Sequence, residues 1–165
     1  MTSAIRRLGR RGDPPPDSLR DVVVVLRQDS AASPELFAAA RATGGTVAVV
    51  LPLKIHGYSL GMPNPGLMPT PRERKLAEEA ITTTVRRLRN AGIDVDGQIV
   101  VTRHAHRAVT GIVRRRGATR VLLEEPTTSR LRRFVEGDLH RQLSRRLGRS
   151  VEVHTPAEPG VPPAS

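Results

Sequence analysis

Arginine is the residue type in this chain with the clearest chemistry. The 165 residues include 27 Lys+Arg against 16 Asp+Glu, giving a formal net charge of +11, and of the 27 only Lys54 and Lys75 are lysines. Guanidinium groups donate paired hydrogen bonds to phosphate or carboxylate oxygens. The stretch 103–149 holds 13 arginines and four acidic residues, which predicts a surface that attracts phosphates, nucleic acid, anionic lipid or an acidic protein. The alternative is a solvated helix surface without a partner.

The histidines and the residue types that are absent limit which metal sites and catalytic mechanisms this chain could have. His104 and His106 would share a face on a strand and could bind a metal, but no third ligand lies nearby in the sequence. We therefore expect surface or helix-start histidines and no metal site. The absence of cysteine excludes disulfides, zinc–thiolate sites and a cysteine nucleophile. Because no Walker loop, nucleophile elbow or zinc-protease motif occurs, we expect no catalytic residues and no enzyme activity.

The hydrophobic pattern alternates between short buried strands and amphipathic helices. The β-branched run 22–26 is typical of a strand buried on both faces, and Thr70 before Pro71, with Glu73 following, is a capping-box helix start. Strands are predicted at 22–26, 46–51, 98–102, 121–123 and 151–153, and helices after Ser33, after Thr70, at 107–116 and after Asp138. This order predicts an α/β fold with a doubly wound five-stranded parallel sheet and helices on both faces, in three Rossmann-type layers.

The predicted domain spans 21–156, between a basic, Pro-rich tail at 1–20 and a tail at 157–165, both expected to be disordered. Within the domain, the stretch 53–69 is longer than most connections and is rich in Gly, Pro and Met, so it is either a binding loop or a simple connector. The longest apolar stretch, 47–53, is far too short to span a membrane. No apolar segment follows the N-terminal arginines. We expect no membrane contact and a cytoplasmic protein.

Several charged residues directly follow the predicted strands. Ligands of doubly wound sheets bind beyond the carboxyl ends of the strands, where the strand order reverses. Arg27 follows the first strand, Arg103 follows the third, and Arg130 lies in the loop beyond the fourth. We expect Glu124 and Glu125 to pair with these arginines and fill the crevice. The alternative is an anionic ligand held by the arginine side chains.

With this element order, the chain resembles the universal stress protein (UspA-like) family. The resemblance covers roughly residues 21–156. It rests on the element order, an Ala-rich first helix, and the run from Val109 through Arg116-Gly117-Ala118 to the strand at 121–123, which looks like the family's helix, Gly-Ala-Asp and hydrophobic strand. The resemblance implies a long loop after the second strand and typically a homodimer. We expect the two copies to pair through the last strand, an edge of the sheet.

The ATP-binding members of this family carry a Gly-x2-Gly-x9-Gly-Ser/Thr signature after strand four, where backbone N–H groups close around the phosphates. On this chain the four positions are Glu124, Thr127, Gly137 and Asp138, so the spacing survives but only one of the three glycines does. Glu124 and Asp138 place carboxylates where phosphate oxygens would rest. Each carboxylate costs on the order of 3 kcal/mol at ~5 Å and an effective dielectric of about 20.

Two further family positions are altered. The adenine-contacting Asp at the end of strand one falls at Arg27, and the Gly-Asp that starts helix three falls at Arg103-His104. The resemblance therefore implies a stress-associated or regulatory protein without catalysis and without a cofactor, which does not bind ATP in the family manner. One alternative is a nucleotide-binding member with a shifted motif, in which Asp29-Ser30 supplies the acidic residue.

Two other function classes stay open at this point. One is a basic adaptor that binds nucleic acid or another polyanion through 103–149 and the N-terminal arginines. With two Phe, one Tyr and no Trp in the chain, such binding would use phosphate contacts rather than base stacking. The other is an enzyme of the wider adenine-nucleotide α-hydrolase-like group, which is disfavoured because no positioned base or nucleophile occurs in the sequence.

Overall fold

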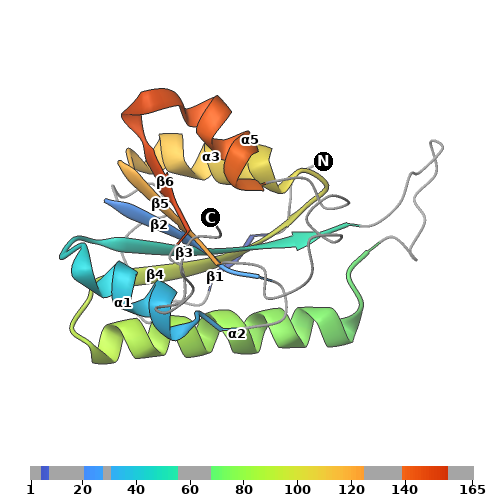
Figure 1. Cartoon of the computed structure of the whole chain (residues 1–165). Helices are drawn as coiled ribbons and strands as arrows, with labels where there is room; N and C mark the ends of the chain where they lie inside the picture. The colour runs from blue at the N-terminus through green and yellow to red at the C-terminus, as the bar shows by residue number, and fades with distance from the viewer. Residues whose placement is uncertain (1–4, 8–20, 28–30, 56–67, 125–138, 156–165) are drawn as a thin grey trace, which may run out of the picture.

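A six-stranded sheet with helices on both faces makes up the fold in the computed structural model (Figure 1). The structure describes residues 5–7, 21–27, 31–55, 68–124 and 139–155. The strands are β1 (Ile5–Arg7), β2 (Val22–Val25), β3 (Val47–Lys54), β4 (Val95–Thr102), β5 (Arg120–Leu123) and β6 (Glu152–His154). The helices are α1 (Pro34–Ala42), α2 (Pro71–Asn90), α3 (Ala105–Arg116), α5 (Leu139–Leu147) and the short 3-10 helix η2 (Gly148–Ser150).

The strands β2 to β6 run parallel to their neighbours, as the alternating pattern predicted. Across the sheet the order is β1-β4-β3-β2-β5-β6. On one side of β2, Val25 lies opposite Val50 of β3, and on the other side it lies opposite Leu123 of β5. Helices α1 and α2 cover one face of the sheet, and α3 and α5 cover the other (Figure 1). The predicted doubly wound, three-layer fold is confirmed, and the strand order reverses between β2 and β5.

Local capping signals set the helix ends. At α1, Ser33 Oγ accepts the N–H of Leu36 at 3.2 Å. At α2, Thr70 and Glu73 form the predicted capping box. Helix α3 ends at Gly117, whose φ of 63° is a left-handed conformation that glycine adopts at low cost. Among the helices that the structure describes, none is both long and apolar enough to cross a bilayer.

Strand β3 is longer than its apolar pattern indicated. The sequence predicts an end at Leu51, whereas β3 continues through Pro52 to Lys54. Its pairing with β2 reaches only to Val50, whose carbonyl accepts the N–H of Leu26 at 2.9 Å. Because alternate residues face the same neighbour, the nitrogen of Pro52 points to the side on which the β2 ladder has already ended. A proline is tolerated in a strand at such a position.

Strand β1 lies in the segment 1–20 that was expected to be a disordered tail. It pairs antiparallel with β4, with Ile5 opposite Val100 and Arg7 opposite Gln98. A run of three residues is too short to show a hydrophobic period, so the sequence pattern did not predict this strand. The result is a sixth strand that covers the outer edge of β4, an edge that would otherwise present unpaired backbone groups.

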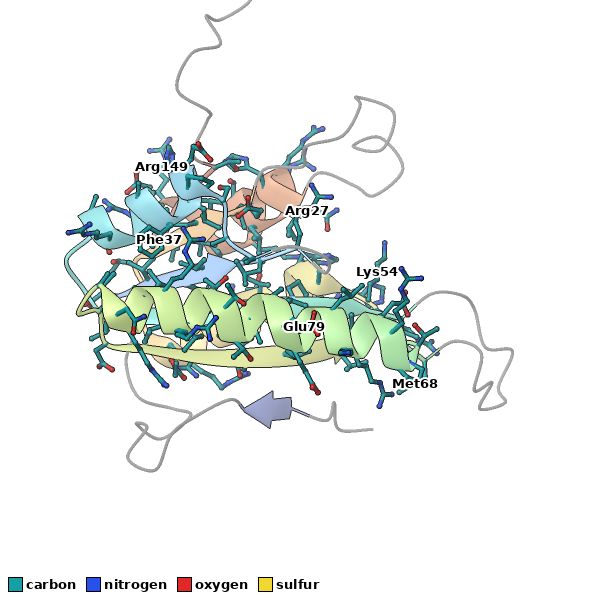
Figure 2. All side chains as sticks on the ribbon, turned by 90° about the horizontal axis from the view of Figure 1, so that it is seen from below. Arg27, Phe37, Lys54, Met68, Glu79 and Arg149 are labelled. Atoms are coloured by element: carbon teal, nitrogen blue, oxygen red, sulfur yellow. The ribbon has the colours of Figure 1, made fainter. Side chains whose placement is uncertain are left out.

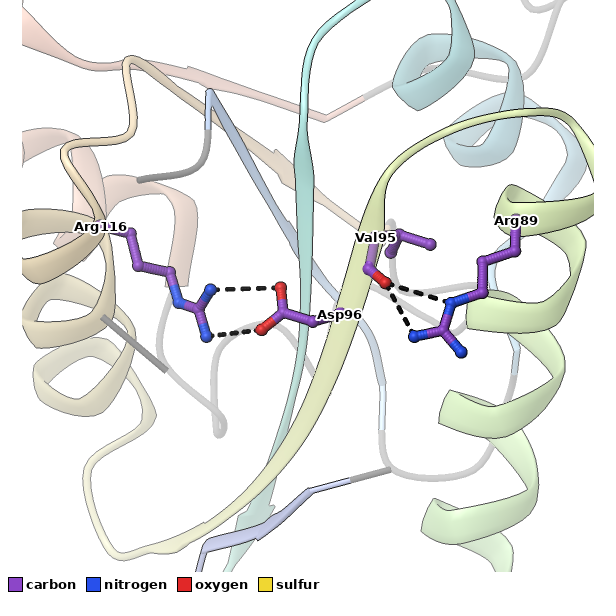
Figure 3. A network of polar contacts seen from close by, with 4 residues as sticks. All are labelled: Arg89, Val95, Asp96 and Arg116. Carbon is purple, nitrogen blue, oxygen red and sulfur yellow. Dashed lines mark hydrogen bonds and ion pairs between the residues drawn. The ribbon is translucent and has the colours of Figure 1, made fainter. Parts of the chain in front are cut away.

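A buried ion pair joins β4 to α3 (Figure 3). Arg116 donates from Nη1 and Nη2 to the two carboxylate oxygens of Asp96 at 3.1 and 2.8 Å, and the two side chains are 3% and 14% exposed. From the other helix layer, Arg89 donates from Nε and Nη2 to the carbonyl of Val95 at 3.3 and 3.1 Å. Two arginines from opposite faces of the sheet therefore hold the beginning of β4.

Removing one partner of the buried pair should destabilise the fold strongly. In Asp96→Ala the guanidinium of Arg116 stays buried without its carboxylate, so we expect the free energy of unfolding to fall by about 3–5 kcal/mol. The control Glu152→Ala breaks an exposed 2.9 Å pair with Arg120 and should cost less than about 1 kcal/mol. Urea unfolding followed by circular dichroism measures both variants. Equal losses in the two would contradict a special role for the buried pair.

Candidate functional site

The candidate site lies where the strand order reverses, beyond the carboxyl ends of β2 and β5. Glu124 directly follows β5, and its N–H donates to the carbonyl of Val25 at 3.0 Å. The N–H of Leu26 donates to the carbonyl of Val50 in β3 at 2.9 Å. These bonds fix the residues at which the chain leaves the sheet. This is the position at which doubly wound sheets bind ligands.

The carboxylate of Glu124 is bonded to the beginning of α1. Ser33, the N-cap residue, donates its backbone N–H to Glu124 Oε2 at 3.1 Å, and both residues are half-buried. A negative charge is favourable at a helix N-terminus, where the first N–H groups lack partners within the helix. Glu124 was expected to pair with arginines. In the described part of the chain its carboxylate instead caps α1.

The segment in front of α1 is also held from α2. Thr84 is fully buried, and its Oγ1 accepts the N–H of Ala32 and donates to the carbonyl of Ala80, both at 3.0 Å. Arg87 donates from Nη1 to the carbonyl of Ala32 at 3.1 Å and lies 4.7 Å from the ring centroid of Phe37. Sequence reasoning missed both roles because Ala32 is 52 and 55 residues away. The available signal was a threonine on the apolar face of a predicted helix.

Three cations lie at the carboxyl ends of β2, β3 and β4. Arg27 is half-buried after β2, Lys54 is exposed at the end of β3, and Arg103 is exposed after β4. Figure 2 shows Arg27 and Lys54 at the same end of the molecule. The structure therefore brings Arg27 and Glu124 together on adjacent strands, whereas Arg103 is two strands away from β2. Lys54 was missed because the predicted strand ended at Leu51.

Four predicted site residues lie outside the described part of the chain: Thr127, Arg130, Gly137 and Asp138. The same holds for Glu125 and for Asp29-Ser30, which carry the shifted-motif alternative. Of the loop predicted at 53–69, the residues 56–67 are not described. At its described end, Met68 is 47% exposed, and whether the loop binds a partner stays a prediction.

His104 and His106 lie at the start of α3, as predicted for helix-start histidines. His104 is the N-cap residue, and the two ring centroids are 5.9 Å apart. Within the described ranges, no group of three or more metal-ligating side chains gathers. Burial lowers the pKa of His106 below its usual 6.5, and the positive charge of Arg146 lowers it further, with His104 and Arg107 adding to the effect and a hydrogen bond with Gln142 opposing it.

The solved structures that this chain resembles are universal stress proteins. No protein-family model and no curated protein sequence matches the chain. A universal stress protein from Archaeoglobus fulgidus superposes with a TM-score of 0.56 at 15% identity, covering 84% of this chain and 95% of that one. A family member from Burkholderia pseudomallei gives 0.56 at 13%, covering 83% and 96%. The Archaeoglobus fulgidus protein in complex with dAMP gives 0.52 at 14%, covering 82% and 98%. The chain therefore has the universal stress protein fold, as the sequence resemblance implied.

The pKa of His106 provides a measurable test of the positive potential between α3 and α5. A lowered pKa means that the folded state favours the neutral ring. The contribution of His106 to the free energy of unfolding is therefore complete above pH 6.5 and is lost as the pH falls below 6.5. We expect His106 to titrate below 6.5 by NMR, and Arg146→Gln to raise its pKa because a nearby positive charge is removed. The control Arg86→Gln, on α2, should leave this pKa unchanged. An unaltered His106 pKa in Arg146→Gln would contradict the electrostatic cause.

Proposed function

We propose that this chain is a non-catalytic, stress-associated or regulatory protein of the universal stress protein type, which does not bind ATP in the manner of the family's ATP-binding members. The observation that carries this proposal is the 3.1 Å hydrogen bond from the Ser33 N–H to Glu124 Oε2. Glu124 falls at the first glycine of the family's phosphate-binding signature. A carboxylate of the chain itself therefore stands near the place at which phosphate oxygens would rest.

Charge and hydrogen bonding both oppose a nucleotide in this crevice. A phosphate at ~5 Å from a carboxylate costs on the order of 3 kcal/mol at an effective dielectric of about 20, which weakens binding roughly a hundredfold. Arg27 falls at the position of the family's adenine-contacting Asp. A guanidinium has hydrogen-bond donors and no acceptor, so it cannot accept from adenine as an aspartate does.

Three polar side chains around the crevice bind the main chain. Thr84 and Arg87 satisfy the N–H and C=O of Ala32, and Glu124 accepts the N–H of Ser33. These contacts hold the segment in front of α1 in place. A general base or nucleophile needs a lone pair or proton directed at a substrate. The observed bonding therefore supports a binding or regulatory role rather than catalysis.

A second candidate is a nucleotide-binding protein that uses a shifted motif. It is favoured by one observation, which is that a structurally similar universal stress protein has been solved in complex with dAMP. In this version Asp29-Ser30 would supply the acidic residue that is missing at Arg27. The two candidates predict opposite results for the binding of ATP to the unaltered chain.

Equilibrium dialysis with labelled ATP and Mg²⁺ distinguishes the two candidates. We expect no low-micromolar site in the parent chain. Glu124→Gln keeps an oxygen that can accept the Ser33 N–H but removes the negative charge, so it should bind ATP more tightly than the parent by up to about a hundredfold. The control Glu79→Gln removes the same charge from the exposed surface of α2 (Figure 2) and should leave ATP binding unchanged.

Two outcomes of this experiment count against the proposal. Low-micromolar binding of one ATP per parent chain would overturn it and support the shifted motif. Equal ATP affinity in the parent and in Glu124→Gln would show that the carboxylate is not the obstacle. Thermal unfolding of both variants confirms that they are folded and reports bound nucleotide as a rise in the melting temperature.

The proposal extends to assembly, with two copies pairing through β6. This strand lies at one edge of the sheet. The N–H of Glu152 donates to the carbonyl of Thr119 at 2.9 Å, so the alternation of a parallel ladder turns the backbone groups of Val153 away from β5. The carbonyl of Val153 lies 3.1 Å from His140 Nε2. Its N–H is then the group that the carbonyl of a second copy would meet.

The variant Val153→Pro tests this edge. Proline removes the outward N–H and leaves the bond between Glu152 and β5 intact. We expect light scattering to give a dimer for the parent and a monomer for the variant. Val151→Ala is the control, because it shortens a neighbouring side chain without changing the backbone donors, and it should stay dimeric. A monomeric parent, or a dimeric Val153→Pro, would contradict pairing through β6.

A further inference from the structure

The described helices α3 and α5 carry many arginines and no acidic residue of their own. The two helices cover the same face of the sheet, and together with η2 they contain eight arginines and no Asp or Glu. One of the eight, Arg116, is buried against Asp96. The remaining seven are exposed and are called the arginine face: Arg107, Arg114, Arg115, Arg141, Arg145, Arg146 and Arg149.

The opposite face of the molecule has a different charge pattern. Helices α1 and α2 contain seven basic and four acidic residues, and the two signs are interspersed, as in the Lys75–Glu79 pair at 3.9 Å. A surface shaped only by solubility carries both signs mixed in this way. The arginine face does not, so its charge is not a general property of the helix surfaces.

Two exposed arginines of α3 lie along one stripe of the helix. Arg107, Gly111 and Arg115 recur every four residues, on the side of the helix opposite the buried Val109 and Val113. A Cβ at Gly111 would meet, among the described residues, the Nη1 of Arg115 at 3.3 Å, the end of a flexible side chain. Core packing therefore does not require glycine here, although glycine costs a helix about 1 kcal/mol relative to alanine. The Arg115 side chain therefore lies beside the position that a side chain at residue 111 would occupy.

Contacts between the two helices join their arginines into one surface. Arg114 donates from Nη2 to the carbonyl of Arg146 at 3.1 Å, which ties the end of α3 to the end of α5. Beside this contact, burial and then the charge of Arg146 lower the pKa of His106, and His104 and Arg107 add to the effect. The arginines beside this contact therefore give the space between the helices a positive potential.

We propose that the arginine face binds the phosphate backbone of double-stranded nucleic acid without reading its base sequence. Guanidinium groups bind phosphate oxygens in bidentate pairs. Arg141 and Arg145 are one helical turn, about 6 Å, apart, and Arg107 and Arg115 are two turns, about 12 Å, apart, so each helix can place more than one guanidinium along a phosphate backbone. Two packed helices, about 8–10 Å apart, offer two such sets of guanidinium groups. The proposal does not depend on what the crevice holds.

The composition of the face favours a phosphate backbone over other polyanions. The apolar side chains of α3 and α5, including Val109 and Leu143 at 0% exposure, are buried against the sheet. This leaves no apolar stripe to enter a membrane and no apolar anchor of the kind that protein interfaces use. The helices also carry no Phe, Tyr or Trp, so unpaired bases would have no stacking platform. The ligand that matches the arginine face is therefore one with regularly spaced negative charges, such as a phosphate backbone.

The test is the binding of a short fluorescent DNA duplex to the full chain, measured by anisotropy at several salt concentrations. The first variant combines Arg107→Gln, Arg115→Gln and Arg145→Gln, which removes three charges from the arginine face. Glutamine is a good helix former, and none of the three side chains is buried. Circular dichroism confirms that the variant is folded.

The matched control removes the same number of charges from the opposite face. It combines Arg72→Gln, Arg74→Gln and Arg86→Gln, all at exposed positions on α2. Both variants have the same net charge, so a difference between them reports the position of the charge rather than its amount.

We expect the duplex affinity of the parent to fall steeply with salt. The face variant should reduce the slope of log K against log salt by about 2.7, because each phosphate contact contributes about 0.9, and it should weaken binding by about tenfold or more at low salt. The control variant should keep the parent slope. Addition of the duplex should also raise the NMR pKa of His106, because phosphates neutralise the arginines near it.

Several results would overturn this assignment. An equal loss of duplex affinity in the two variants would show diffuse attraction by the whole positive chain. If the parent showed no salt-dependent binding of the duplex, nucleic acid would not be the ligand of this face. Polyglutamate that displaces the duplex at equal charge would indicate an acidic protein partner. Binding to phosphatidylserine vesicles that the face variant abolishes, in the absence of duplex binding, would indicate a membrane surface.

Discussion

The burial of strand β2 on both faces is the constraint on which the rest of this structure depends. Its four valines lie in the centre of the sheet, between β3 and β5, and are at most 3% exposed. Val22 and Val24 pack into the core under α1 and α2, and Val23 and Val25 pack under α3 and α5. A strand without a solvated face needs a helix layer on each side. The crossovers that supply these layers reverse the strand order beside β2 and place the crevice at its carboxyl end.

The polar residues of the crevice follow from that placement. Ala32 and Ser33 directly precede α1, and because Ala32 is buried and Ser33 is half-buried, their peptide groups are largely removed from water. Buried N–H and C=O groups need partners, and here Thr84, Arg87 and Glu124 supply them. These side chains therefore satisfy a requirement of the fold before they could serve a ligand. A glycine-rich phosphate loop leaves such groups open, and the proposed absence of family-type ATP binding rests on that difference.

Features that depend on local sequence could be predicted, and features that depend on a distant partner could not. The helix starts at Ser33 and Thr70 and the stop at Gly117 need only neighbouring residues, and all three were predicted correctly. The continuation of β3 through Pro52 depends on where β2 stops pairing. Glu124 was recognised as a site residue, but its partner is a backbone amide 91 residues away. A backbone amide is present at every residue except proline, so the sequence pattern could not identify this one.

The arginines behind the positive net charge fall into two groups in the structure, those that bind groups of the fold itself and those on the surface. Arg116, Arg89 and Arg87 bind a carboxylate or carbonyl inside the molecule, because a long stem and a planar fork let arginine reach buried acceptors. Seven exposed arginines lie on α3, α5 and η2, whose own residues include no Asp or Glu. Two copies of this chain would repel each other across that face, which agrees with the proposed pairing through β6 instead. The same asymmetry leaves the arginine face open in the proposed dimer, so that an anionic partner and a second copy would not compete for one surface.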